Sequence, residues 1–145
     1  MFSAIVGLPQ SEDIYRQAAL RLVGSGPNLS EAELTLKEIG KKKTNLGMLG
    51  PIEKAELIRT FAFRSLPIEQ FENAIYATEE LTVITKCNTQ DVALFVADLF
   101  LLFSPTDGVH ATLVTDNLYE SIKITPVPPE EYFLAFQKSR RLVVS

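Results

Sequence analysis

The chain has 145 residues, of which 46% are hydrophobic and 22% charged, with a formal net charge of −4. This composition excludes an intrinsically disordered chain, and the length suits a single domain, residues 1–145, that folds without disulfides or metal. Cys87 is the single cysteine, which excludes an intrachain disulfide and favours a reducing compartment, so we expect a cytoplasmic protein.

Four helices are predicted in the helical part, residues 1–79. Each begins at a residue type that favours a helix N-terminus and repeats apolar residues at helical spacing. Their ranges are residues 12–23, 31–39, 51–64 and a fourth helix that begins at Pro67. Ser30 and Glu33 have the spacing of a capping box at the start of the second helix, and Gly40 is expected to end it.

A buried strand is predicted at Leu81–Thr85, because this segment, LTVIT, is short and rich in β-branched residues. A central helix follows, from Asp91 to Phe103, with Asn88 or Thr89 as its cap. Its apolar stretch from Val92 spans twelve residues, whereas a membrane-spanning helix needs about 20. We therefore expect a core helix and no membrane contact.

Residues 110–125 alternate in a way that predicts two paired strands. Ala111 and Leu113 would share one face of the first strand, and Ile122 and Ile124 one face of the second, with Asp116-Asn117 as the turn. This turn pair is a weaker hairpin signal than Asn-Gly.

A final helix is predicted from Pro129, with Tyr132, Phe133 and Phe136 as its apolar positions. The predicted fold class is α+β. The helical part packs on a small, mainly antiparallel sheet in the mixed part, residues 80–145, in the order α-α-α-α-β-α-β-β-α.

Candidate catalytic residues are few. Asp91 and Asp98 are seven residues apart and lie within about 20° on one helical face, which could hold a cation, although a solvent-facing stripe is the favoured interpretation. A small enzyme that uses Asp98, Cys87 or His110 is one alternative. Zinc is rejected because one cysteine and one histidine leave a four-ligand site incomplete. No metal and no cofactor is expected.

Lys41, Lys42 and Lys43 stand in a glycine-punctuated loop before Pro51 and could contact an anion. A regulator or accessory factor that binds nucleic acid through this loop is a second alternative. Residues 80–137 oppose it, because eight carboxylates against two lysines give them a net charge of −6, which repels phosphates. Nucleic-acid binding is therefore disfavoured.

The leading hypothesis is a non-enzymatic protein-interaction or assembly module: a small acidic adaptor, chaperone-like protein or structural component. The central helix is apolar nearly all round, which indicates either a buried position or a contact with another chain. We therefore predict a protein partner or self-association as a homodimer. The candidate contact residues are aromatic or aliphatic positions of the last two helices: Phe95, Leu99, Phe103, Tyr132 and Phe136.

Overall fold

The computed structural model describes the backbone of residues 2–105 and 108–135 and the side chains from Ser11 onward. Six α-helices account for most of this part of the chain, and residues 129–135 form a further helical segment. Their bounds are α1 (Phe2–Val23), α2 (Leu29–Lys41), α3 (Pro51–Phe63), α4 (Phe71–Thr85), α5 (Thr89–Phe103) and α6 (Gly108–Ile124). A 3₁₀ turn, η1 (Ile68–Gln70), leads into α4. The described residues contain no strand, so the predicted α+β fold with its antiparallel sheet is wrong.

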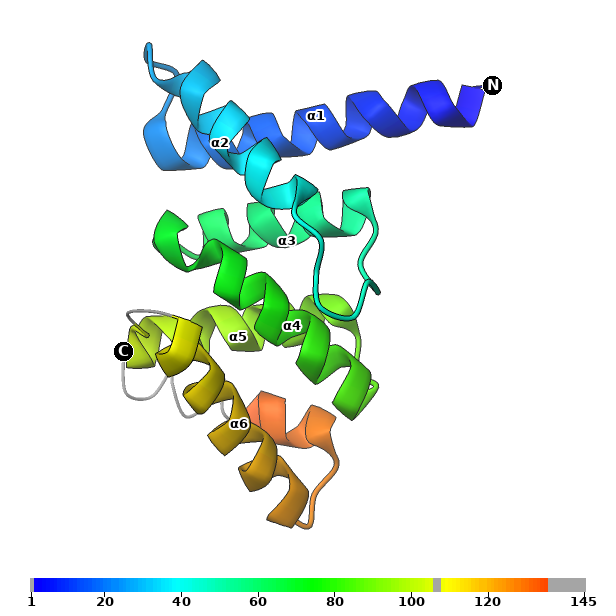
Figure 1. Ribbon diagram of the computed structural model, residues 1–145, viewed down its shortest axis with the longest axis vertical. Helices are drawn as coiled ribbons and strands as arrows, with labels where there is room; N and C mark the ends of the chain where they lie inside the picture. The colour runs from blue at the N-terminus through cyan, green and yellow to red at the C-terminus, as the bar shows by residue number, and fades with distance from the viewer. Residues whose placement is uncertain (1, 106–107, 136–145) are drawn as a thin grey trace.

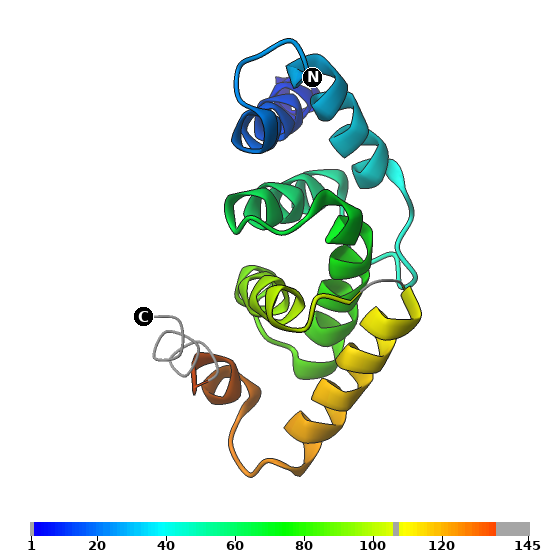
Figure 2. The same ribbon diagram turned by 90° about the vertical axis from the view of Figure 1, so that its left-hand side faces the viewer.

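The helices form two layers of consecutive pairs (Figures 1 and 2). Helices α1, α3 and α5 stack in one layer with residues 129–135 after them, and α2, α4 and α6 form the other layer. Within the first layer, α3 packs against both α1 and α5, and across the layers α1 packs against α2, α3 against α2 and α4, and α5 against α4. The architecture is thus a stack of helical hairpins, in which one face of each layer meets the other layer and one face remains outside.

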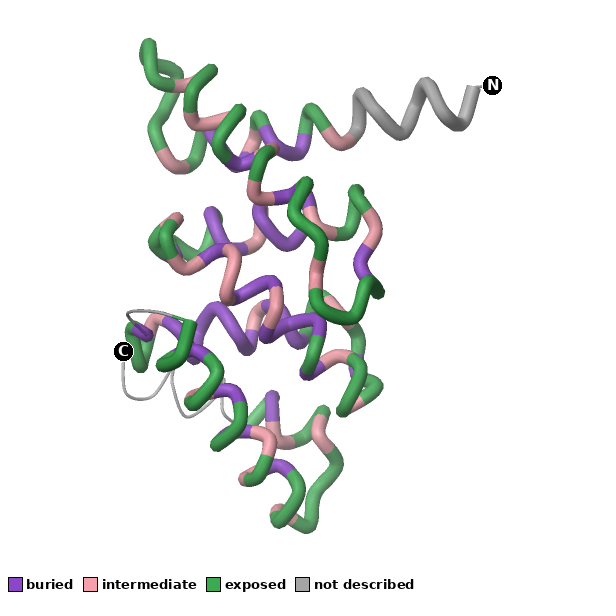
Figure 3. The backbone as a smooth tube through the Cα atoms, in the orientation of Figure 1, coloured by how far each residue is buried: buried purple, intermediate pink, exposed green. Residues whose placement is uncertain are grey.

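Large aromatic side chains fill the space between the layers. Phe61, Phe71, Phe95 and Phe100 are fully buried, and the backbone around them forms the buried centre in Figure 3. The ring centroids of Phe61 and Phe71 are 5.9 Å apart, and those of Phe95 and Phe133 are 4.5 Å apart, within the usual range for aromatic pairs. The phenylalanines therefore join α3, α4, α5 and residues 129–135 in one core.

The predicted strand Leu81–Thr85 is instead the last part of α4. Leu81 continues a buried helical stripe that begins at Phe71 and passes through Ala74 and Thr78. The Thr78 and Thr85 hydroxyls donate to the carbonyls of Ala74 and Leu81, each at 2.7 Å, so these β-branched residues fit the helix without losing a hydrogen bond. Packing on the other layer overrides the local β preference.

The predicted hairpin at residues 110–125 is also wrong, because this segment belongs to α6. Its buried residues, Ala111, Thr115, Leu118 and Ile122, follow the helical spacing i, i+4, i+7, i+11. Leu113, which the alternation placed on an inner strand face, is exposed. The apparent period of two came from apolar residues that lie on the outer face of the helix.

Two helix starts agree with the sequence. The Asn88 side chain accepts from the amides of Gln90 and Asp91 at 2.9 and 3.4 Å, as predicted for α5, and α3 begins at Pro51 as predicted. The capping box of α2 is wrong: α2 begins at Leu29, so Ser30 already lies inside it. Gly40 does not end α2 but packs on α1, where a β-carbon would overlap the Tyr15 hydroxyl. Likewise, α1 begins at Phe2 rather than Glu12.

Candidate functional site

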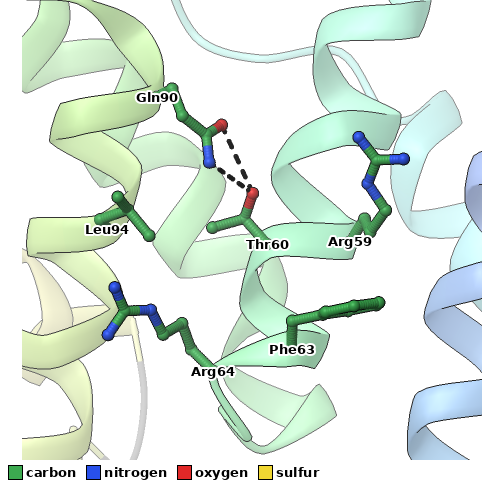
Figure 4. A pocket seen from close by; sticks show the side chains of 6 residues that line it. All are labelled: Arg59, Thr60, Phe63, Arg64, Gln90 and Leu94. Carbon is green, nitrogen blue, oxygen red and sulfur yellow. Dashed lines mark hydrogen bonds between the residues drawn. The ribbon is translucent and has the colours of Figure 1, made fainter.

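The outer face of the first layer is hollowed between α3 and α5. The hollow has a volume of about 260 Å³ and is lined by Arg59, Thr60, Phe63, Arg64, Gln90 and Leu94. Figure 4 shows these side chains: Arg59 and Phe63 lie on the side of α3 away from α5, and the Arg64 guanidinium group points the other way, towards Leu94 of α5. We call it the α3–α5 groove.

Polar side chains connect the helices along this groove. Thr60 and Gln90 hydrogen-bond across it, with the Gln90 Nε2 atom 3.0 Å from the Thr60 hydroxyl oxygen (Figure 4). On the α1 side, Arg59 donates to the Gln17 Oε1 atom at 2.9 Å. Because Gln17 is neutral, this contact does not neutralise the positive charge of Arg59. The groove therefore has a fixed shape and a basic wall.

Asp98 forms an ion pair with the guanidinium group of Arg64. Asp98 is 6% exposed, and its Oδ1 atom lies 3.5 Å from Nη1 of the more exposed Arg64. The sequence interpretation that Asp91 and Asp98 mark one solvent-facing stripe is therefore wrong for Asp98, although Asp91 is exposed. A partly buried ion pair across two helices holds the Arg64 side chain beside the groove.

The groove combines two features that attract different parts of one ligand. Two guanidinium groups can each donate paired hydrogen bonds to a carboxylate or phosphate. In the same groove, the Phe63 ring is 53% exposed, although phenylalanine is usually buried. An apolar surface that shares a groove with two cationic donors suits an apolar side chain with acidic neighbours.

The predicted contact residues fall in different environments. Phe95 and Leu99 are buried in the core, Tyr132 is half-buried and its hydroxyl lies 3.2 Å from that of Ser121, and Phe103 is exposed at the end of α5. Phe136 lies outside the described residues. Of the four residues of this set that the structure describes, Phe103 has the most accessible side chain.

The three lysines at the end of α2 and the start of the next loop are all exposed, but they are not equivalent. Lys42 Nζ lies 2.9 Å from Glu72 Oε2 on α4, and this ion pair lowers the pKa of Glu72. Lys41 and Lys43 flank it. Lys41 and Lys43 are thus exposed to solvent, whereas Lys42 joins the end of α2 to α4.

Cys87 lies in the loop between α4 and α5, whereas His110 lies in the first turn of α6. Cys87 is buried, and its Sγ atom lies 3.6 Å from Glu130 Oε1. Asp98, by contrast, faces Arg64 on α3. The structure does not bring the predicted catalytic residues together.

Cys87 should react slowly with iodoacetamide. Burial raises the pKa of its thiol, and the nearby Glu130 carboxylate raises it further, so less of the reactive thiolate is present near neutral pH. We expect the rate of alkylation, followed by mass spectrometry, to rise with pH above the usual range for a thiol. The same chain in urea should react at the rate of a cysteine peptide, and an equal rate in the folded chain would contradict the assignment.

The residues of the groove were not predicted as a site. Arg59, Phe63 and Arg64 all lie in the predicted third helix, on positions outside its apolar stripe of Ile52, Ala55, Ile58 and Ala62, and an exposed phenylalanine among arginines was the available signal. The sequence does not show that α5 forms the other side of the groove, because this depends on how α3 stacks on α5.

The chain matches no protein-family model, no curated protein and no solved structure. In the described part, no single helix has both the length and the apolar content to cross a membrane. Helices α5 and α6 meet these criteria only as a pair, and the chain bends by 118° between them.

Proposed function

We propose that the protein is an interaction module whose α3–α5 groove binds an acidic segment of a protein partner. The observation that carries the proposal is the exposed Phe63 ring, which lines the same groove as Arg59 and Arg64. An apolar side chain of the partner would cover the ring, and acidic residues on either side of it would pair with the guanidinium groups.

The architecture supports this function. Stacked helix pairs offer extended outer faces that many proteins of this type use for binding. The hydrogen bonds between Thr60 and Gln90 and between Arg59 and Gln17 hold three helices of that face in register. A groove that is already formed loses little conformational entropy when it binds. The proposal keeps the interaction hypothesis that the sequence suggested but assigns it to residues of α3 and α5.

The test is selection of peptides from a random display library on the wild-type chain. We expect enrichment of sequences in which a large apolar residue is flanked by Asp or Glu. A selected peptide, labelled and followed by fluorescence anisotropy, should bind the Arg59→Glu/Phe63→Ala variant at least tenfold more weakly, because the variant loses both the charge and the apolar contact.

Lys123→Glu is the matched control, since Lys123 is exposed on α6 in the other layer and the substitution changes the net charge equally. It should leave binding within about twofold, because exposed charges separated by more than about 10 Å are screened at ordinary salt. Peptides without acidic residues, or peptides that bind the groove variant as well as they bind the wild type, would refute the proposal.

A further inference from the structure

A buried carboxylate fixes the loop between α2 and α3, residues 42–50. Glu79 on α4 is 2% exposed and accepts hydrogen bonds from the amides of Leu46 and Met48, at 2.9 and 3.0 Å, and from the Thr44 hydroxyl. The Lys42–Glu72 ion pair holds the start of the loop on the same helix. These contacts give the loop a defined conformation despite its lack of regular structure.

The fixed loop presents apolar side chains to the outside. Met48 is 63% exposed and Leu46 is half exposed, and Gly47 between them has a positive φ of 64°, which a glycine adopts without strain. Lys43 is exposed beside them. A loop that is anchored by a buried charge and yet leaves two large apolar residues in water is pre-organised for a partner.

A complementary surface lies on the same layer of the protein. A shallow hollow of about 690 Å³ is lined by Asn73 of α4 and by Gly108, Val109, Thr112, Leu113 and Asp116 of α6. Val109 and Leu113 are exposed and supply its apolar wall. Asp116 supplies a negative charge. Burial raises the pKa of the nearby Glu80, and the charge of Asp116 raises it further. We call it the α6 hollow.

The loop and the α6 hollow belong to one continuous face. A smaller cavity is lined by Asn45 of the loop, by Asn73 and Glu80 of α4 and by Thr112 of α6, so all three elements meet there. In Figure 1 the loop and α6 flank α4 on its two sides. A two-fold axis that runs along this face, near α4, would place the loop of each copy over α6 of the other.

We propose that this face pairs two copies of the chain, with Leu46, Met48 and Lys43 of each copy seated in the α6 hollow of the other. Leu46 and Met48 would cover Val109 and Leu113, and Lys43 would approach Asp116 and Glu80, where it offsets the repulsion between the two carboxylates. The interface is separate from the α3–α5 groove, which lies on the other layer, so groove variants should leave the mass of the assembly unchanged.

Sedimentation velocity over a range of concentrations tests the pairing. The wild-type chain should approach twice its mass of 16.1 kDa as the concentration rises. Met48→Glu and Leu113→Glu should each weaken the dimer at least tenfold, because a charge would enter a desolvated apolar contact. Leu34→Glu is the control, because Leu34 and Leu113 are equally exposed, at 57%, but Leu34 lies on α2. A wild-type chain that stays monomeric, or a dimer that persists in both loop and hollow variants, would overturn the proposal.

A mixing experiment tests the reciprocal geometry. Lys43→Glu and Asp116→Lys should each weaken self-association by about tenfold, since each homodimer would contain two like-charged contacts. When the two variants are mixed, both contacts become pairs of opposite charge, and the dimer should recover. Recovery in the mixture, together with weaker pairing at high salt, supports the two-fold arrangement. If the mixture stays as monomeric as its components, the lysine does not meet Asp116 of a second copy.

Discussion

Replacement of Glu79 by alanine should lower the free energy of unfolding by about 3 kcal/mol, because the substitution removes a buried carboxylate that accepts three hydrogen bonds. The amides of Leu46 and Met48 would lose their partners, and the loop would lose its attachment to α4. Urea denaturation followed by circular dichroism measures the change. Hydrogen exchange should show faster exchange at these two amides in the variant than in the wild type.

Two further variants show whether the loss of stability comes from the hydrogen bonds of Glu79 or from any substitution in this part of α4. Glu80→Ala changes the exposed neighbour of Glu79 and should alter stability by less than about 0.5 kcal/mol. Glu79→Gln keeps an acceptor oxygen but loses the charge, so its stability should lie between those of alanine and wild type. If Glu79→Ala proves as stable as Glu80→Ala, the carboxylate does not hold the loop.

The sequence predicted helices well where local chemistry specifies them. Pro51 at the start of α3 and the Asn88 cap of α5 are local signals, and both are confirmed. It failed where a residue's preference depends on what packs against it. Leu81 and the threonines of α4 favour a strand in isolation, yet the buried stripe from Phe71 to Leu81 requires a helix. In α6, the spacing of Ala111, Thr115, Leu118 and Ile122 was present in the sequence, but alternation at nearby positions obscured it.

The two candidate sites were harder to predict from the sequence, because each joins residues that are distant in the chain. Arg64 and Asp98 meet only because α3 stacks on α5. The interaction between Glu79 and Met48 connects residues 31 positions apart, and no local pattern marks that glutamate as buried. The lysines of the basic loop are a local signal, but no sequence pattern marks Leu46 and Met48 as the residues that the Glu79 carboxylate holds outward.

The second large effect should come from Phe61. Its ring is fully buried between the layers, 5.9 Å from the ring of Phe71, so Phe61→Ala would leave a cavity where α3 and α4 meet. We expect a loss of about 4 kcal/mol in the free energy of unfolding, since truncation of a buried phenylalanine costs both the transfer energy and the cavity. Thermal or urea denaturation of the purified variant measures this loss.

Phe63 is the matched control, because it lies two residues away on the same helix and its side chain is 53% exposed. Phe63→Ala should lower stability by less than about 1 kcal/mol. It should nevertheless weaken the binding of peptides selected on the α3–α5 groove, whereas Phe61→Ala should affect binding only in proportion to unfolding. Equal losses of stability in the two variants would mean that α3 does not have one buried face and one outer face, and the groove assignment would fail with it.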